Sequence, residues 1–425
     1  MQALKGFKDI LPDEAALWQR VEATARDVFQ RFGFEEIKVP ILERTGLFAR
    51  SIGEATDIVE KEMYTFNDRN GESLTMRPEG TAPVLRAFIE HALHLRRPLS
   101  RLFTIGPMFR HERPQKGRLR QFHQLSVEAL GSDHPRLDAE VIAMARQILV
   151  ELGLAAELQL NSLGCPACRP AYRQKLVNFF AGHQEQLCED CRRRATANPL
   201  RVLDCKSANC RALNAKAPAI LDALCPPCAQ HLTTVRRNLD TLQAPHRLNP
   251  FMVRGLDYYT RTTFELITDA LGSQGAVGAG GRYDSLVHRL GGQNLPGIGF
   301  ALGIERLVLL LQEQPMAPAS GPDLFLACLG EAAAEYGFTL LHQCRLAGLS
   351  ALMNFQTPGL KSQMRQADRL KARLVLLIGA NELNAGQAVL RDLTSKEECQ
   401  VPLNDELAAL LANKLPTPDP LISGL

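Results

Sequence analysis

The chain has 425 residues, of which 45% are hydrophobic and 22% charged, and its formal net charge is +3. This length and composition predict an ordinary globular protein of two or three domains. The low net charge argues against a protein that binds nucleic acid over most of its surface. A polyanion would therefore have to bind at local clusters of basic side chains. The first residues carry acids and the apolar runs are too short to span a membrane, so we expect a cytoplasmic protein without a membrane anchor.

The first third of the chain mixes helices with strands. Residues 13–32 place apolar side chains along one face and predict an amphipathic helix. FEEIKVPIL follows as a strand that Pro40 stops. Strands and loops continue to about residue 131, and residues 138–153 predict a second helix.

The rest of the chain divides where pattern and composition change. Residues 162–245 carry most of the cysteines and are mostly helical in pattern, whereas strand patterns return with MVRGLDYYTRTTFELIT and end in a helix after Gly303. Pro, Ala and Ser enrich the next segment, which is typical of a linker. Strands and helices then alternate as β-α-β-α-β, which predicts a small α/β domain. The predicted segments are 1–161 and 246–312 for two parts of one core, 162–245 for an insertion, 313–322 for the linker and 323–425 for the last domain.

Five basic residues lie between two β-prone runs, residues 101–109 and 121–130. In the second run Gln124, Ser126 and Glu128 alternate with apolar residues and therefore share one face of a strand. If the two strands pair, Arg110 stands on that polar face, where a guanidinium can bind two phosphate oxygens in a defined plane. A solvated, charged loop explains the basic residues equally well, so the pattern alone leaves both interpretations open.

The stretch GPMFRHERPQKGRLRQF resembles motif 2 of the class II aminoacyl-tRNA synthetases, in the form carried by histidyl-tRNA synthetases. GFEEIKVPILE resembles motif 1, and GIGFALGIERLVLLL resembles motif 3. RGLDYYTRTTFE and AVGAGGRYDSLV resemble the two histidine-specific segments of that family, and TMRPEGT its substrate-binding turn. The resemblance covers nearly the whole chain. It implies an α+β catalytic core built on an antiparallel sheet, a mostly helical insertion and a C-terminal α/β anticodon-binding domain.

The resemblance also implies an activity. A histidine–tRNA ligase activates L-histidine with ATP to histidyl-adenylate and pyrophosphate, and then transfers histidine to the 3′ end of histidine tRNA. The implied cofactor is Mg²⁺ on the ATP phosphates, and motif 1 implies a homodimer. The family pattern assigns Arg110 and Arg254 to catalysis at the α-phosphate, Arg110, Arg118 and Arg306 to ATP, Glu79, Thr81, Gln124, Glu128, Tyr258 and Tyr259 to histidine, and Arg113 and Gln115 to the tRNA acceptor end.

Each of these residues also has a plainer interpretation when taken singly. Tyr258 and Tyr259 could be a core pair, Arg306 could pair with Glu305, and Glu79 before a glycine could be turn chemistry. The order and spacing of all the motifs together favour a binding site.

Eight cysteines between residues 165 and 228 need a separate explanation. Two thiolates in a CxxC turn supply half of a tetrahedral zinc site, so eight thiols predict one or two structural Zn²⁺ ions that do not touch catalysis. Many members of the family that the chain resembles lack these cysteine pairs. Thiols without a bound metal remain the alternative. The cysteines are Cys165, Cys168, Cys188, Cys191, Cys205, Cys210, Cys225 and Cys228.

Two other functions remain open at the level of sequence. One is a non-catalytic, synthetase-like regulatory subunit of ATP phosphoribosyltransferase, although such paralogues typically lose the anticodon domain and parts of the site. The other is a class II synthetase for another amino acid, against which the LDYY segment argues.

Overall fold

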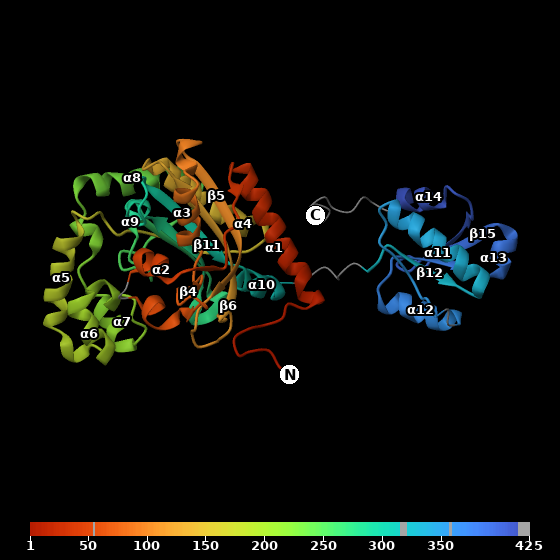
Figure 1. Cartoon of the computed structure of the whole chain (residues 1–425), viewed down its shortest axis with the longest axis horizontal. Coiled ribbons are helices and arrows are strands. Elements are labelled where there is room, and N and C mark those ends of the chain that lie inside the picture. The colour runs from red at the N-terminus through yellow and green to blue at the C-terminus, as the bar shows by residue number, and fades with distance from the viewer. Residues whose placement is uncertain (54–55, 315–320, 357–358, 415–425) are drawn as a thin grey trace. The chain divides into compact units, whose positions relative to one another are not determined.

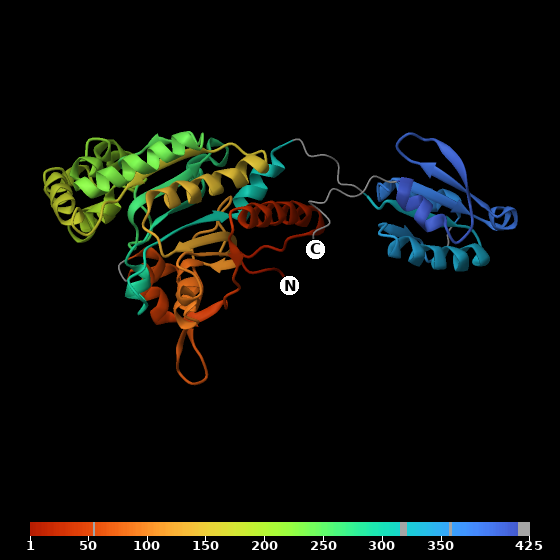
Figure 2. The same cartoon turned by 90° about the horizontal axis from the view of Figure 1, so that it is seen from above.

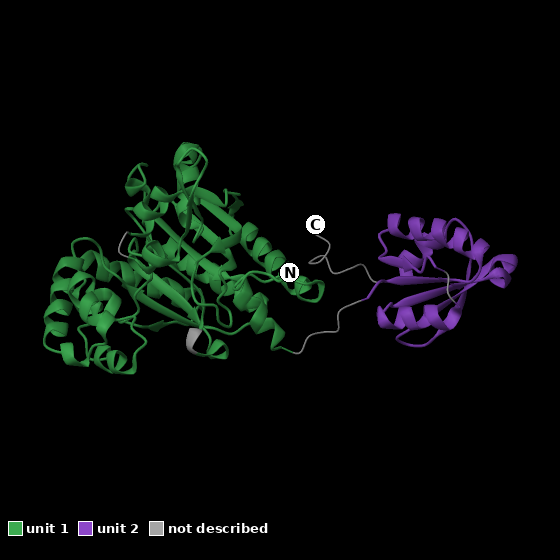
Figure 3. Cartoon of the chain, turned by 60° about the horizontal axis from the view of Figure 1, so that its bottom comes forward, with its two compact units in different colours: residues 1–314 green, residues 315–425 purple. Residues whose placement is uncertain are grey.

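The structure is a computed structural model that describes residues 1–53, 56–314, 321–356 and 359–414. The chain forms two compact units, residues 1–314 and 315–425, which are coloured separately in Figure 3. Among the described residues, no helix has the length and apolar character needed to cross a bilayer.

An eight-stranded sheet is the centre of unit 1. The neighbouring strands are antiparallel except for two parallel pairs at the edges, β1 with β5 and β7 with β8. This sheet confirms the predicted fold class. In spatial order the strands are β1 (Glu35–Glu36), β5 (Ser100–Phe109), β6 (Gln121–Leu130), β11 (Gly297–Gly303), β10 (Ala276–Arg282), β9 (Thr260–Ile267), β7 (Glu157–Ser162) and β8 (Arg247–Leu248).

Four helices cover one face of this sheet (Figures 1 and 2). They bury their apolar stripes against the apolar face of the sheet, on which Leu125, Val127 and Ala129 of β6 are fully buried. Because side chains alternate along a strand, Gln124, Ser126 and Glu128 point to the opposite face, as predicted. The helices are α1 (Pro12–Arg31), α4 (Pro135–Glu151), α8 (Pro226–Thr241) and α10 (Ile304–Gln312).

The opposite face of the sheet is only partly covered. A smaller apolar cluster joins the helix that follows the TMRPEG turn to Tyr258, Tyr259 and Tyr283. The elements on this side are α2 (Thr45–Ile52), α3 (Thr81–Glu90), α9 (Leu286–Arg289) and a three-stranded sheet of β2 (Leu42–Arg44), β4 (Ser73–Met76) and β3 (Tyr64–Asn67). The part of the face that they leave open holds the cavity described below.

The cysteine-rich segment folds as a helical body with its own small core, which includes Tyr172, Leu176 and Phe180. Its helices α5 (Arg169–Ala181), α6 (Glu189–Ala197) and α7 (Ala208–Asn214) precede α8, which returns the chain to the main sheet. Phe251 and Val253, from the segment that follows the insertion, pack against this core.

Unit 2 has a five-stranded sheet in the order β13 (Ala351–Met353), β12 (Leu324–Cys328), β14 (Leu374–Ile378), β15 (Gln387–Asp392) and β16 (Glu398–Pro402). The first three strands are parallel, as the β-α-β-α-β pattern predicts, and the last two are antiparallel additions that the pattern did not indicate. Apolar clusters lie on both faces of the sheet. The helices are α11 (Glu331–Leu346), α12 (Leu360–Arg369), α13 (Ala380–Ala385) and α14 (Leu407–Lys414).

Two predicted strands are shorter than expected. FEEIKVPIL pairs with β5 only through Glu35 and Glu36, and the N–H of Ile37 adds one hydrogen bond to Phe103 O. Pro40 cannot donate to a ladder, so the strand does not continue. The strand expected from Met252 begins only at Thr260, because the chain before it turns toward the insertion.

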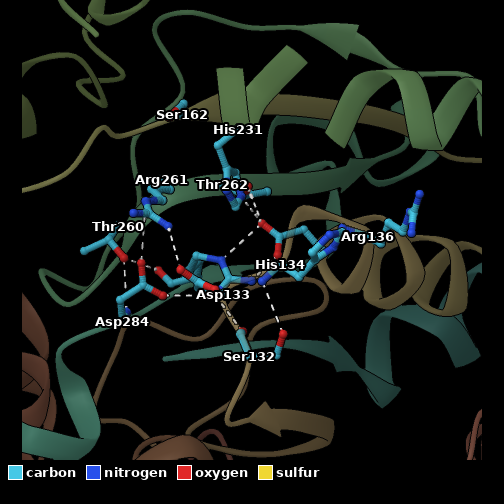
Figure 4. Close-up of polar contacts among 12 residues, drawn as sticks. Ser132, Asp133, His134, Arg136, Ser162, His231, Thr260, Arg261, Thr262 and Asp284 are labelled. Atoms are coloured by element: carbon cyan, nitrogen blue, oxygen red, sulfur yellow. Dashed lines mark hydrogen bonds and ion pairs between the residues drawn. The ribbon is translucent and has the colours of Figure 1, made fainter. Parts of the chain in front are cut away.

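A buried ionic network fixes β10 to the helical layer. The carboxylate of Asp138 on α4 accepts hydrogen bonds from Arg282, from His231 at 2.8 Å and from Thr262 at 2.5 Å, and Asp138 and Arg282 are both fully buried. Figure 4 labels two members of this network, His231 on α8 and Thr262 on β9. Tyr283 is the next residue after Arg282, so the network also sets the position of that ring beside the cavity.

Candidate active site

A cavity of about 650 Å³ opens on the polar face of the main sheet. Its wall combines segments that are distant in sequence: the β5–β6 hairpin, the start of α3, the segment before β9, strands β10 and β11 and the start of α10. Arg110, Arg118, Arg254 and Arg306 all line it. Guanidinium groups bind phosphate oxygens in defined planes, so these four suit a phosphorylated ligand, although acidic side chains line the cavity as well.

Arg110, Arg118 and Arg306 lie close together, and each already donates to a protein acceptor. Arg110 donates from Nε to Pro78 O at 2.8 Å and lies 5.4 Å from the centre of the Phe122 ring. Arg306 donates from Nε to Gly117 O at 3.2 Å and from its Nη1 to Ala276 O, so it joins the hairpin loop to β10. Burial and the neighbouring Arg118 and Arg110 cations lower the pKa of Arg306. An anion among these groups would relieve their repulsion.

Arg254 stands on another part of the wall. Its Nη1 forms an ion pair with Glu265 on β9, and its guanidinium carbon lies 5.7 Å from the centre of the Tyr259 ring. Its Nε is buried and has no hydrogen-bond partner among the described residues. Arg254 is therefore oriented by Glu265 and retains a free donor.

Glu79 and Thr81 lie where the TMRPEG turn enters α3. The Glu79 carboxylate accepts the N–H groups of Thr81 and Ala82, each at 2.8 Å, which is the turn chemistry that the plainer interpretation predicted. Glu79 also lines the cavity. Burial raises the pKa of Glu79, and these hydrogen bonds and the Arg110 cation oppose that rise. Each carboxylate oxygen retains a second lone pair for an ammonium group.

The polar face of β6 forms the floor beside this turn. Gln124 and Ser126 line the cavity, whereas Glu128 lies behind its wall, is 1% exposed and accepts a hydrogen bond from Tyr283. Burial raises the pKa of Glu128 to about 8, although hydrogen bonds from Tyr283 and Thr81 lower it. Gly299 on β11 faces Glu128, and a Cβ there would lie 2.2 Å from Oε2, so only glycine fits.

Tyr258 and Tyr259 are almost completely buried, yet both rings line the cavity. Burial raises the pKa of each phenol, so both remain neutral hydrogen-bonding groups. The interpretation as a core pair describes one side of these rings, which pack in the cluster with Tyr283. The rings also face the cavity.

Several buried polar atoms at this wall lack a protein partner. In the part of the chain that the structure describes, Gln124 Oε1, Ser126 Oγ and Arg254 Nε form no hydrogen bond. Buried polar groups are nearly always paired in native proteins, so unpaired ones that converge on a cavity indicate a polar ligand.

Arg113 and Gln115 do not belong to this cavity. Both are exposed in the loop of the β5–β6 hairpin, where Gln115 pairs through its backbone with Arg118. The ion pair suggested between Arg306 and Glu305 does not form, because the Glu305 carboxylate accepts the backbone N–H of His123 at 2.9 Å.

Residues that the sequence did not single out complete the wall. Glu265 orients Arg254, and its carboxylate could have been noticed as the one acid in its strand. Arg201, Asp204 and Lys206 come from the insertion and line the cavity next to Arg254. The segment between Cys191 and Cys210 therefore folds back onto the core, whereas the expectation that the zinc ions themselves do not touch catalysis stays a prediction.

The eight cysteines form two separate clusters of four thiols. The outer cluster is Cys165, Cys168, Cys225 and Cys228, and the inner cluster is Cys188, Cys191, Cys205 and Cys210. In each cluster the Sγ atoms lie within 4.8 Å of one another. Neighbouring sulfurs are 3.7 Å apart for Cys165 and Cys168, and 3.8 Å apart for Cys188 and Cys205. Four thiolates around one Zn²⁺, with Zn–S of about 2.3 Å, lie about 3.8 Å apart.

Comparisons with known proteins agree with this geometry. The profile of the histidyl-tRNA synthetase family matches residues 6–307, and that of the anticodon binding domain matches residues 323–413. The chain belongs to the histidyl-tRNA synthetase family.

Individual members of the histidyl-tRNA synthetase family are similar over nearly the whole chain. A histidine–tRNA ligase of Desulfotalea psychrophila is 56% identical over 96% of this chain and 96% of its own length, and one of Geobacter sulfurreducens is 53% identical over 96% and 98%. The crystal structure of the apo histidyl-tRNA synthetase of S. aureus is 36% identical, covers 97% of this chain and 100% of its own, and superimposes with a TM-score of 0.81.

Proposed function

We propose that the chain is a histidine–tRNA ligase that forms histidyl-adenylate from L-histidine and ATP and then esterifies histidine tRNA. The observation that carries this proposal is the convergence of four arginines with Glu79, Gln124 and the Tyr258–Tyr259 pair in one cavity. The family membership and the similarity to named histidine–tRNA ligases support it.

In the first step, a carboxylate oxygen of histidine attacks the α-phosphorus of ATP. A new carboxyl–phosphorus bond forms, the bond from that phosphorus to the bridging oxygen breaks, and pyrophosphate leaves with the electron pair. Negative charge builds on the α-phosphoryl oxygens, so Arg110 and Arg254 contribute most in the transition state. Arg118 and Arg306 bind the outer phosphates or the adenine. No protein base is needed, because the attacking carboxylate is already ionised.

Magnesium belongs on the outer phosphates of ATP. Mg²⁺ in nucleotide sites is typically held by substrate phosphates, waters and one or two carboxylates. Glu62 and Glu112 line the cavity beside Arg110 and Arg118, and besides burial the Glu112 carboxylate raises the pKa of Glu62, so the two acids lie near each other. This donor set fits the ion, which would draw charge from the leaving pyrophosphate.

Histidine would bind with its ammonium group at Glu79 and Thr81. Its imidazole would lie among Gln124, Tyr258 and Tyr259, with Glu128 behind them. A pocket that bonds both ring nitrogens leaves buried polar groups unpaired when another side chain enters, and such pockets reject analogues by about 10⁴–10⁵-fold. An editing domain is not required for that selectivity.

The tRNA would be contacted at two places. Arg113 and Gln115 are exposed in the hairpin loop, from which they can reach the acceptor end. Unit 2 would read the anticodon, where unstacked bases expose their edges, and its match to the anticodon binding domain supports this role.

We further propose a cytoplasmic homodimer that pairs through the motif 1 region. β1 is at the edge of the main sheet, and the nearby Ile41 and Leu42 are each 42% exposed. Exposed apolar residues beside a sheet edge are typical of a protein interface.

Each thiol cluster is proposed to hold one structural Zn²⁺. The four sulfurs of each cluster have the spacing of a tetrahedral tetrathiolate site. The small insertion would gain stability from such ions that its limited core does not provide.

The activity is tested by charging a histidine tRNA transcript with labelled histidine in the presence of ATP and Mg²⁺. Esterified histidine on the tRNA is the expected product. Absence of charging, together with binding of an ATP phosphoribosyltransferase catalytic subunit, would instead indicate the regulatory-subunit alternative.

A further inference from the structure

The inner cluster lies on the side of the insertion that reaches the catalytic cavity. Cys205 lies between two cavity-lining residues, Asp204 and Lys206, and Arg201 lies four residues before it. The outer cluster instead joins the start of α5 to the start of α8, where the insertion leaves and rejoins the core. The two clusters therefore have different places in the fold.

We propose that a Zn²⁺ ion in the inner cluster is a positioning device for catalysis: it fixes residues 199–206, and through Arg201 it fixes the segment that carries Arg254. The proposal rests on the function proposed above, because it gives Arg254 a role in adenylate formation. It assigns the metal of this cluster an effect on turnover as well as on stability.

A continuous set of contacts connects the inner cluster to Arg254. The Arg201 guanidinium donates to Gly255 O at 2.5 Å and lies 3.6 Å from the Asp257 carboxylate. Gly255 directly follows Arg254, so this hydrogen bond restrains the backbone that presents the catalytic guanidinium. The Arg201 side chain is only 14% exposed, which limits the other positions that it could adopt.

The same loop is tied to the cluster at its other end. The backbone N–H of Cys205 donates to Val202 O at 3.1 Å, and the buried side chain of Asn214 donates to the same carbonyl at 2.6 Å. The backbone N–H of Cys188 in turn donates to the sulfur of Cys210 at 3.2 Å. These hydrogen bonds and the thiols together join the loop, α6 and α7 into one unit.

Packing alone stabilises this unit only weakly. Helix α6 has nine residues and α7 has seven, and helices of this length are marginal without tertiary support. Their shared core is small, and half of the inner cysteines are partly exposed. A metal that joins α6, the loop and α7 supplies the missing restraint.

The experiment uses the full-length protein purified under reducing conditions, with zinc measured by elemental analysis and adenylate formation by ATP–pyrophosphate exchange. Cys205→Ser should bind one zinc fewer than wild type, and its kcat should fall by about 10–100-fold, the usual cost of losing a group that orients an active site. The KM for histidine should change less, because only Tyr258 and Tyr259 of the proposed histidine pocket lie on this segment, whereas Glu79, Thr81 and Gln124 lie on other elements.

Three further variants separate the metal from the cysteine and from general stability. Cys205→His supplies another zinc ligand, so it should retain the metal and most of the turnover. Arg201→Ala should retain every zinc and lose kcat as Cys205→Ser does, which tests the connection even if Cys205→Ser fails to fold. Cys399→Ser, an exposed cysteine in unit 2, should match wild type in both measurements.

Normal kcat in Arg201→Ala, or in a folded Cys205→Ser protein that has lost zinc, would overturn the proposal. So would a wild-type protein that contains no zinc, contains iron instead, or has the inner thiols joined as disulfides. Zinc in a protein that does not catalyse exchange would refute the proposed function, whereas exchange by a zinc-free protein would refute only this inference.

Discussion

Replacement of Arg254 by alanine is the most informative single change at the active site. Arg254 has one buried Nε donor without a partner among the residues that the structure describes, while its Nη1 is occupied by Glu265. Loss of one preorganised donor to a developing anion typically costs about 10²–10³-fold in kcat, or about 2.7–4 kcal/mol. Loss of the full positive charge adds to this, so we expect kcat for pyrophosphate exchange to fall by about 10³-fold.

The effect on folding should be much smaller than the effect on catalysis. Arg254→Ala leaves Glu265 without its partner, but that side chain is 21% exposed and retains contact with water. We expect a loss of about 1–3 kcal/mol in the free energy of unfolding, measured by urea denaturation. Arg254→Met combined with Glu265→Gln should restore that stability without restoring exchange, and Arg247→Ala, with a side chain 72% exposed, is the matched control.

A rate within about threefold of wild type in a folded Arg254→Ala protein would refute the reasoning, because no transition-state interaction would then have been lost. An equal loss of exchange in the exposed control would also refute it, since the effect would not be specific to the cavity.

Three other predictions follow from the described contacts. Because burial raises the pKa of Glu128 to about 8, the folded state holds a proton on this carboxyl that the unfolded state loses; Glu128 should therefore contribute a fall of about 1.4 kcal/mol per pH unit in the unfolding free energy between about pH 4.5 and 8, and Glu128→Gln should show a slope smaller by that amount in urea titrations. Asp138→Asn removes the buried counter-ion of Arg282, which keeps only the partly exposed Asp284, and should cost about 3–5 kcal/mol, whereas the exposed Asp133→Asn should cost little, and equal melting temperatures would contradict this. Arg113→Ala should lower the rate of tRNA charging much more than that of pyrophosphate exchange, and a parallel loss of both would show that Arg113 does not act on tRNA.

The polar floor of the site could be predicted from the sequence because its signal is local. Alternation along residues 121–130 places Gln124, Ser126 and Glu128 on one face, and in the structure Gln124 and Ser126 line the cavity while the apolar residues between them pack in the core. The identity of the family also came from short motifs that are continuous in sequence.

Features that depend on distant segments could not be predicted in the same way. Nothing in the CxxC spacings says which pairs meet, so the division into outer and inner clusters emerged only from the fold. Arg201 lies in a segment that looks like a solvated part of the insertion, and only its hydrogen bond to Gly255 O reveals its place. Strands β15 and β16 were missed because much of each is exposed, which weakens the apolar signal of a strand.

The central claim is that these arginines and the histidine pocket form a single adenylate-forming site. ATP–pyrophosphate exchange by the wild-type protein, measured with each standard amino acid in turn, tests it most directly. We predict Mg²⁺-dependent exchange with histidine alone. Exchange with a different amino acid, or none with histidine, would contradict the account.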